Sequence, residues 1–208
     1  MNGDLFVTGT DTGVGKTLLS ALLVAGLTRK YWKPVQTGAC EGTDRETVMK
    51  WAGIDGHQTY PERYIFDSPV SPHLAARQQN AEINLDDIRR PASLDRLIIE
   101  GAGGVLVPLN DHALMLDLMR RLGAPVLVAS RTALGTINHT LLTLMALRNA
   151  KLDIRGVVMI GKENRDNRLA VERYGSVPVV GWIPWLEKID RETLVSVFQQ
   201  FFDAQALA

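Results

Sequence analysis

A glycine-rich segment near the start of the sequence constrains the fold more than any other feature. The segment "GTDTGVGKT" spans residues 9–17, follows the apolar stretch 5–7 and opens an apolar stretch with helical spacing at 16–27. A strand, a glycine-rich loop and a helix in this order are typical of a phosphate-binding loop. The spacing departs from the common form by one residue, because Thr10 stands where the first glycine is usual and Gly9 precedes it.

The chemistry of the loop survives the extra residue. Backbone N–H groups at the start of a helix attract phosphate oxygens. Lys16 is placed to reach the β- and γ-phosphates, and the hydroxyl of Thr17 is placed to hold Mg²⁺. We therefore predict that a nucleoside triphosphate binds here; the alternative is a turn that only joins a strand to a helix.

Short apolar stretches alternate with helical patterns along the rest of the sequence. Several of the expected strands are apolar throughout, as when helices cover both faces of a parallel sheet. The prediction is a mostly parallel α/β sheet with helices on both faces, in a single domain over residues 1–208. Strands are expected at 5–7, 32–35, 97–99, 126–128, 157–159 and 179–181, and helices at 16–27, 44–52, 114–122, 137–150, 168–174 and 191–202, with another starting at Ser71-Pro72. The segment 53–84, rich in Pro, Ser and His, shows no clear pattern and is expected at the surface around a site.

Composition excludes several classes of function. The formal net charge is +0 with no basic cluster, so the charge pattern of a nucleic-acid binder is missing. Cys40 is the only cysteine, which excludes an internal disulfide and suits a reducing compartment. No secretory signal and no apolar run long enough to span a membrane is visible. We expect a cytoplasmic protein whose partners include neither nucleic acid nor membrane.

The segment "YWKPVQTG" carries a second candidate cation. Lys33 stands near the end of an expected strand, where its ammonium group would help neutralise a phosphoryl group in transfer. Pro34 removes a backbone donor, so the alternative is an edge strand with a solvated lysine. Asp44 opens the next helix, either as a metal ligand opposite Thr17 or only as a favourable charge at a helix N-terminus.

The segment "LIIEGAGG" is an expected strand that ends in an acid and a glycine-rich turn. Glu100 stands where phosphate-binding-loop proteins place a carboxylate that holds Mg²⁺. The glycines after it let the backbone come close to a ligand. The alternative is a surface acid at the end of a strand.

Taken together, these segments resemble the dethiobiotin synthetase family. The resemblance covers most of the chain and rests on "VTGTDTGVGKT", "KPVQTG", "SPHLAA", "EGAGG", "LGTINHTLLT" and "GWIPWL", which occur in the family's order. The glycine spacing of the loop is itself a mark of that family. The resemblance implies a homodimer whose subunits each contain a mainly parallel seven-stranded sheet.

The activity that the resemblance implies is ATP-dependent closure of a ureido ring. CO₂ forms a carbamate on one amine of 7,8-diaminopelargonate, the carbamate attacks the γ-phosphate of ATP, and the second amine then closes the ring and expels phosphate. Lys16 and Lys33 would stabilise the carbamate and the phosphoryl group, and Mg²⁺ would lie among Thr17, Asp44 and Glu100.

The resemblance also implies roles for other residues. Thr12 would contact the substrate and take part in catalysis, and Thr37 would contact the substrate. Asn138 would reach the substrate carboxylate across the dimer interface. The nucleotide would contact the loop Gly13, Val14, Gly15, Lys16, Thr17 and Leu18, the turn Glu100, Gly101, Ala102 and Gly103, and, around the adenosine, Pro184, Trp185 and Leu186. His73 and His139 are either substrate contacts or structural residues.

One departure from the family pattern and two alternative functions complete the interpretation. Ile160 stands where many relatives have an Asn that reads adenine, which leaves the choice of nucleobase open. An ATPase switch of the partitioning type would carry a second lysine early in the loop, and residues 9–14 contain none. An amide synthetase linked to an amidotransferase would need a nucleophilic cysteine in a glutaminase domain. We further expect Lys33→Ala to abolish ring closure and to leave the fold intact.

Overall fold

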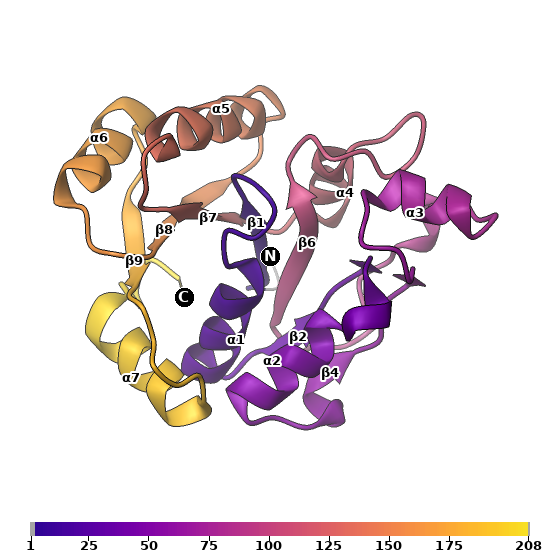
Figure 1. Cartoon of the computed structure of the whole chain (residues 1–208), viewed down its shortest axis with the longest axis horizontal. Coiled ribbons are helices and arrows are strands. Elements are labelled where there is room, and N and C mark those ends of the chain that lie inside the picture. The colour runs from indigo at the N-terminus through magenta and orange to yellow at the C-terminus, as the bar shows by residue number, and fades with distance from the viewer. Residues whose placement is uncertain (1–2, 208) are drawn as a thin grey trace.

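The computed structural model describes residues 3–207, and a parallel sheet forms its centre (Figure 1). All pairings between neighbouring strands of this sheet are parallel. The seven strands, in spatial order, are β4 (Thr59–Tyr60), β2 (Lys30–Trp32), β6 (Leu97–Gly104), β1 (Leu5–Gly9), β7 (Val126–Arg131), β8 (Ile154–Ile160) and β9 (Val179–Ile183). The predicted α/β fold with a mostly parallel seven-stranded sheet is confirmed.

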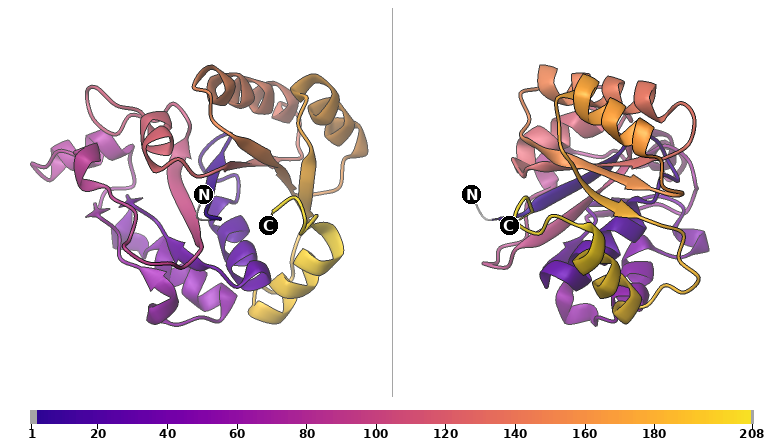
Figure 2. Two further views of the ribbon diagram at one scale, coloured as in Figure 1. Left: turned by 180° about the vertical axis from the view of Figure 1, so that it is seen from behind. Right: turned by 90° about the vertical axis from the view of Figure 1, so that its left-hand side faces the viewer.

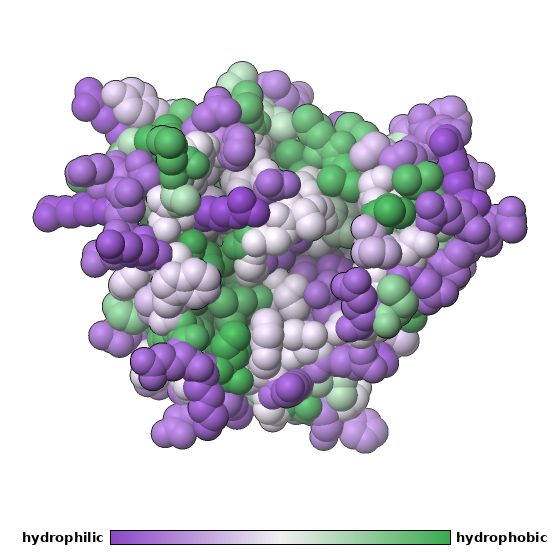
Figure 3. All heavy atoms as spheres, viewed as in Figure 1, coloured by the Kyte–Doolittle hydropathy of each residue, from purple (hydrophilic) through white to green (hydrophobic). Residues whose placement is uncertain are grey.

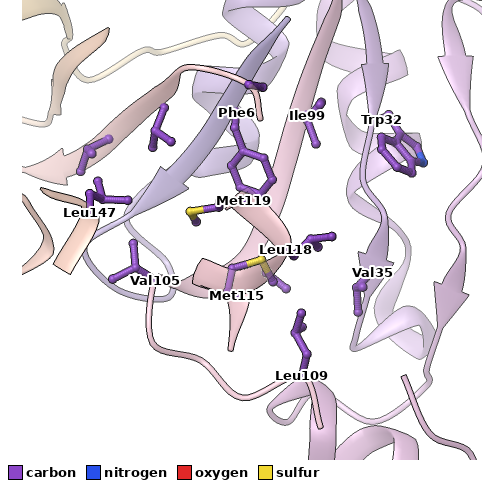
Figure 4. Close-up of a cluster of buried hydrophobic side chains, with 14 of the residues drawn as sticks. Phe6, Trp32, Val35, Ile99, Val105, Leu109, Met115, Leu118, Met119 and Leu147 are labelled. Carbon is purple, nitrogen blue, oxygen red and sulfur yellow. The ribbon is translucent and has the colours of Figure 1, made fainter. Parts of the chain in front are cut away.

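Helices cover both faces of the sheet, as predicted. One face is covered by α1 (Lys16–Leu27), α2 (Asp44–Ala52) and α7 (Arg191–Phe201), and the other by α4 (Met115–Leu122), α5 (Thr136–Asn149) and α6 (Arg165–Gly175). The right-hand view of Figure 2 shows these two helical layers above and below the strands. Each layer buries its own apolar cluster against the sheet, and Figure 4 shows the cluster that includes Phe6, Ile99, Met115 and Leu118.

The expected strand 32–35 is wrong as a single element, because Pro34 interrupts it. β2 ends at Trp32, and β3 (Val35–Gln36) pairs with β5 (Tyr64–Ile65) in a separate two-stranded sheet. Pro34 has no N–H to donate to a ladder, and its carbonyl accepts hydrogen bonds from the backbone N–H groups of Arg63 and Tyr64. Lys33 therefore lies at the junction between the two sheets.

The segment 53–84, which showed no clear pattern, supplies the seventh strand. β4 and β5 are two residues long, and α3 (Pro72–Gln78) starts where Ser71-Pro72 predicted it. Short 3₁₀ turns lie at Ala39–Glu41, Gly56–Gln58 and Leu85–Asp87. No helix among residues 3–207 is long and apolar enough to cross a membrane.

Several strands and helices extend beyond the expected ranges or start and end a residue or more away from them, and the changes in α6 and β6 affect the interpretation most. α6 starts at Arg165, earlier than the predicted residue 168, because the side chain of Asn164 accepts a hydrogen bond from the N–H of Asn167 and caps the helix. β6 continues to Gly104 along β1, with a register shift between Val7 and Gly9. Glu100 thus lies within a strand, and the expected glycine-rich turn after it belongs to the same strand.

Candidate active site

The phosphate-binding loop joins β1, the central strand, to the N-terminus of α1. Gly13 and Gly15 have φ angles of 70° and 98°, a left-handed conformation that favours glycine. A methyl group added at Gly15 would lie 2.9 Å from Cδ1 of Ile160, so the loop also packs tightly against the end of β8. The first turn of α1 has neither a side-chain cap nor an acidic residue, which leaves its N–H groups available to an anion.

Lys16 folds back over this loop. Its Nζ donates a hydrogen bond of 3.0 Å to the carbonyl oxygen of Asp11, and the side chain is largely buried. Burial lowers the pKa of Lys16, and the nearby Glu100 carboxylate offsets that effect only in part. The ammonium group is therefore held at the mouth of the loop with few other partners, where a phosphate would give it a counter-charge.

Two carboxylates, a hydroxyl and an ammonium group meet beside the loop. The Thr17 hydroxyl lies 2.9 Å from Oδ1 of Asp44 and 2.9 Å from Oε1 of Glu100. The Nζ atom of Lys33 lies 2.8 Å from Oδ2 of Asp44 and 3.1 Å from Oε1 of Glu100. These four side chains come from the start of α1, the residue after β2, the start of α2 and the strand β6, and the structure brings all of them together.

Lys33 is 4% exposed, which excludes the alternative of a solvated lysine on an edge strand. Burial alone would lower the pKa of Lys33, but the negative charges of Glu100 and Asp44 outweigh it and raise that pKa. Burial would likewise raise the pKa of Asp44, and the Lys33 ammonium outweighs it, so the pKa of Asp44 falls. Lys33 and Asp44 are therefore both charged near neutral pH.

The position of Asp44 follows from the way α2 starts. Thr43 caps the helix: its hydroxyl accepts from the N–H of Glu46, and the Glu46 carboxylate accepts from the N–H of Thr43. The backbone N–H of Asp44 donates to the side-chain oxygen of Gln36 at 3.1 Å. The amide nitrogen of the same buried side chain donates to the carbonyl of Thr37 at 2.7 Å. Gln36 therefore connects the start of α2 to the chain that follows β3.

Three residues that form hydrogen bonds to the site were not predicted from the sequence. The first is Gln36; the second is Tyr31, whose hydroxyl donates to Oε2 of Glu100 at 3.0 Å. The third is Arg131, which donates from Nη2 to the carbonyl of Thr12 at 3.1 Å. None of the three carries a local sequence signal, because each contact joins segments that meet only in the fold.

A pocket of about 720 Å³ opens over these groups. Its walls include most of the residues predicted for the site: Thr12, Gly13, Gly15, Lys16, Thr17, Leu18, Lys33, Thr37, Asp44, Glu100, Ala102 and Gly103. Val14 is buried behind the loop, and the carbonyl of Gly101 faces Nζ of Lys33 at 3.5 Å. Asn138, Pro184, Trp185 and Leu186 lie outside the walls of this pocket.

The donor set fits Mg²⁺. This ion is usually held by one or two carboxylates together with substrate phosphates, and it prefers hard oxygen ligands. Asp44, Glu100 and the Thr17 hydroxyl supply such oxygens within hydrogen-bonding distance of one another, next to the phosphate-binding loop. The residues present therefore match the predicted magnesium site in kind.

Comparison with known proteins identifies the family. A protein family described as an AAA domain matches residues 3–193. The ATP-dependent dethiobiotin synthetase BioD of Paramagnetospirillum magneticum is 45% identical over 193 residues, which are 93% of each chain. The chain belongs to the ATP-dependent dethiobiotin synthetase family. The dethiobiotin synthetase of Rhodopseudomonas palustris is 42% identical and covers 99% of this chain and 98% of its own length.

Solved structures agree with the fold. A ParA family ATPase from Chlorobium tepidum superposes with a TM-score of 0.57, covers 94% of this chain and 90% of its own, and is 13% identical. At such low identity the likeness concerns the fold alone. The dethiobiotin synthetase relatives are far more similar in sequence, so the comparisons favour the synthetase over the partitioning-type switch.

Proposed function

We propose that the chain catalyses the ATP-dependent conversion of 7,8-diaminopelargonate and CO₂ to dethiobiotin, ADP and phosphate, a ligase reaction of biotin biosynthesis. The observation that carries the proposal is the meeting of Lys33, Asp44 and Glu100 beside the phosphate-binding loop. The chain's similarity to dethiobiotin synthetases that match nearly the whole chain supports the proposal. We also propose that residues 1–208 act as one domain in the cytoplasm.

The pocket suits the chemistry of the reaction. An amine nitrogen bonds to CO₂ to give a carbamate; a carbamate oxygen then bonds to the γ-phosphorus and ADP departs. The second amine bonds to the carbamate carbon, phosphate leaves, and the ring is closed. The ammonium groups of Lys16 and Lys33 stabilise the negative charge of carbamate and phosphoryl oxygens. Substrate is oriented by Thr12 and Thr37, which line the same pocket.

Thr17, Asp44 and Glu100 would hold Mg²⁺, which would supply positive charge to the phosphate oxygens. The Lys33 ammonium group forms ion pairs with both Asp44 and Glu100. It therefore lies in the same part of the site as the proposed metal ligands. Both lysines can therefore serve the phosphoryl transfer without a covalent intermediate on the protein.

The adenosine is proposed to lie between α1 and α7. Figure 3 shows apolar surface between these helices. The partly buried side chains of Leu18, Ile160 and Leu186 pack against the same buried cluster as α1 and α7. Pro184 and Trp185 follow the end of β9 on the same side, and Trp185 is exposed. An apolar wall of this kind holds a base by contact.

The homodimer is a proposal that two observations support. Asn138 is exposed on α5 and does not line the pocket of its own chain, so it can reach a substrate only across an interface. The side chains of Leu106, Leu134, Leu142 and Met145 are exposed on or beside α5 and after β6. An apolar surface of this kind is usual at subunit contacts, and we place the second subunit there.

The test is phosphate release measured with ATP, Mg²⁺, bicarbonate and 7,8-diaminopelargonate, and then with each one left out. The proposal predicts that phosphate appears only with the complete mixture, because the phosphoryl acceptor is the carbamate of the diamine. Phosphate release at the same rate without the diamine would refute it and would favour an ATPase switch.

A further inference from the structure

Glu100 uses its two carboxylate oxygens differently. Oε1 accepts hydrogen bonds from the Thr17 hydroxyl and from Nζ of Lys33, which lie on the pocket side. Oε2 accepts from the hydroxyl of Tyr31 at 3.0 Å, on the interior side. Glu100 itself is 1% exposed, so both contacts lie away from bulk solvent.

Tyr31 is rigidly placed for this contact. It lies on β2 directly beside β6, in register with Ile98, and its side chain is 0% exposed. Its ring is buried in the apolar cluster under α1 together with Leu19 and Leu22. A ring packed in this way has no other rotamer available without opening the core, so the hydroxyl stays on Oε2.

From this geometry we infer that Tyr31 is a positioning residue that makes Glu100 a monodentate metal ligand and thereby favours Mg²⁺ over Ca²⁺. Oε2 is occupied by the phenol hydroxyl, which leaves Oε1 to face the metal. Mg²⁺ demands near-octahedral geometry and takes carboxylates through one oxygen, whereas Ca²⁺ accepts more ligands and often binds both oxygens of a carboxylate. The inference rests on the magnesium site of the proposed function.

The decisive variant is Tyr31→Phe, which keeps the ring and removes the hydroxyl. Mg²⁺ and Ca²⁺ are each titrated by calorimetry into the protein bound to a non-hydrolysable ATP analogue. Residues that orient a metal ligand typically change metal affinity by about 10- to 100-fold. We expect the ratio of Mg²⁺ to Ca²⁺ affinity to fall by about 10-fold or more, since Oε2 becomes free to bind Ca²⁺.

Tyr60→Phe is the matched control. Tyr60 lies on β4, the other neighbour of β2, and its hydroxyl donates to Asp95 at 2.8 Å, away from Glu100. Its loss should leave the affinity ratio unchanged. An unchanged ratio in Tyr31→Phe, or an equal fall in Tyr60→Phe, overturns the inference. Neither outcome depends on the diamine, so failure of the proposed reaction is distinguished by the phosphate-release test.

A second measurement uses the wild-type protein and covers the case in which Tyr31→Phe does not fold. Carboxylate stretching bands separate monodentate from bidentate binding in infrared difference spectra, and ¹³C-labelled glutamate removes the contribution of Asp44. With either metal, the bands that respond should be those of a monodentate glutamate. Bidentate bands with Mg²⁺ would contradict the inference.

Discussion

At the scale of single residues, Lys33 changes most between the sequence and the structure. From the sequence its head group was expected to contribute little to the core, so that Lys33→Ala would keep the fold. In the structure its Nζ atom is buried between Asp44 and Glu100. Removing one partner of a buried ion pair leaves uncompensated charge, which costs about 3 to 5 kcal/mol.

Lys33→Ala should therefore lose both ring closure and stability. We expect a free energy of unfolding lower by about 3 kcal/mol, measured in urea, and no detectable dethiobiotin. Because a divalent cation supplies the missing positive charge, saturating Mg²⁺ should return part of the lost stability to this variant. Wild-type stability in Lys33→Ala would show that the two ion pairs contribute little.

The same pairs set the pH range in which they stabilise the fold. The pKa of Asp44 lies below its ordinary 3.8, so its stabilisation is present above that pH and is lost as pH falls through the folded-state pKa. The pKa of Lys33 lies above 10.5, so its stabilisation is present below that pH and is lost as pH rises through the folded-state pKa. Subtracting the Lys33→Ala profile of unfolding free energy against pH from the wild-type profile should give a plateau with losses at these two ends. A flat difference would contradict the pairing.

At the scale of elements, the start of α2 controls where Asp44 lies. Thr43→Ala removes the cap and should lower the free energy of unfolding by about 1 kcal/mol. It should also weaken Mg²⁺ binding, since the first turn carries a proposed ligand. Asp190 caps α7 by accepting from the N–H of Thr193, so Asp190→Ala is the control: similar loss of stability, unchanged Mg²⁺ affinity. Equal Mg²⁺ affinities in the two variants would show that the cap at Thr43 does not position the metal ligand Asp44.

The sequence predicts some of the helices and strands and not others. α1 and α2 begin and end where the helical patterns of the sequence placed them. β4 could not be found, because two residues are too short for a period and gain their place only by pairing with β2. The contact of Tyr31 with Glu100 depends on β2 lying beside β6, and no local pattern specifies that pairing.

At the scale of the whole molecule, the proposed dimer links the α5 surface to activity. Leu134 is 103% exposed, so Leu134→Glu should leave the folded subunit intact and place charge in the interface. We expect light scattering to show monomers at concentrations where the wild type is dimeric, with a raised KM for the diamine because Asn138 of the second subunit is lost. A monomeric wild type would remove the basis for the role of Asn138.

The central claim is that one phosphate leaves ATP for each ring closed in the pocket above Lys33 and Glu100. The most direct measurement follows ¹³C from labelled bicarbonate by mass spectrometry, with phosphate measured in the same sample. The account predicts dethiobiotin that carries the label in its ureido carbon, in amounts equal to the phosphate released. Phosphate formed without labelled product would contradict it.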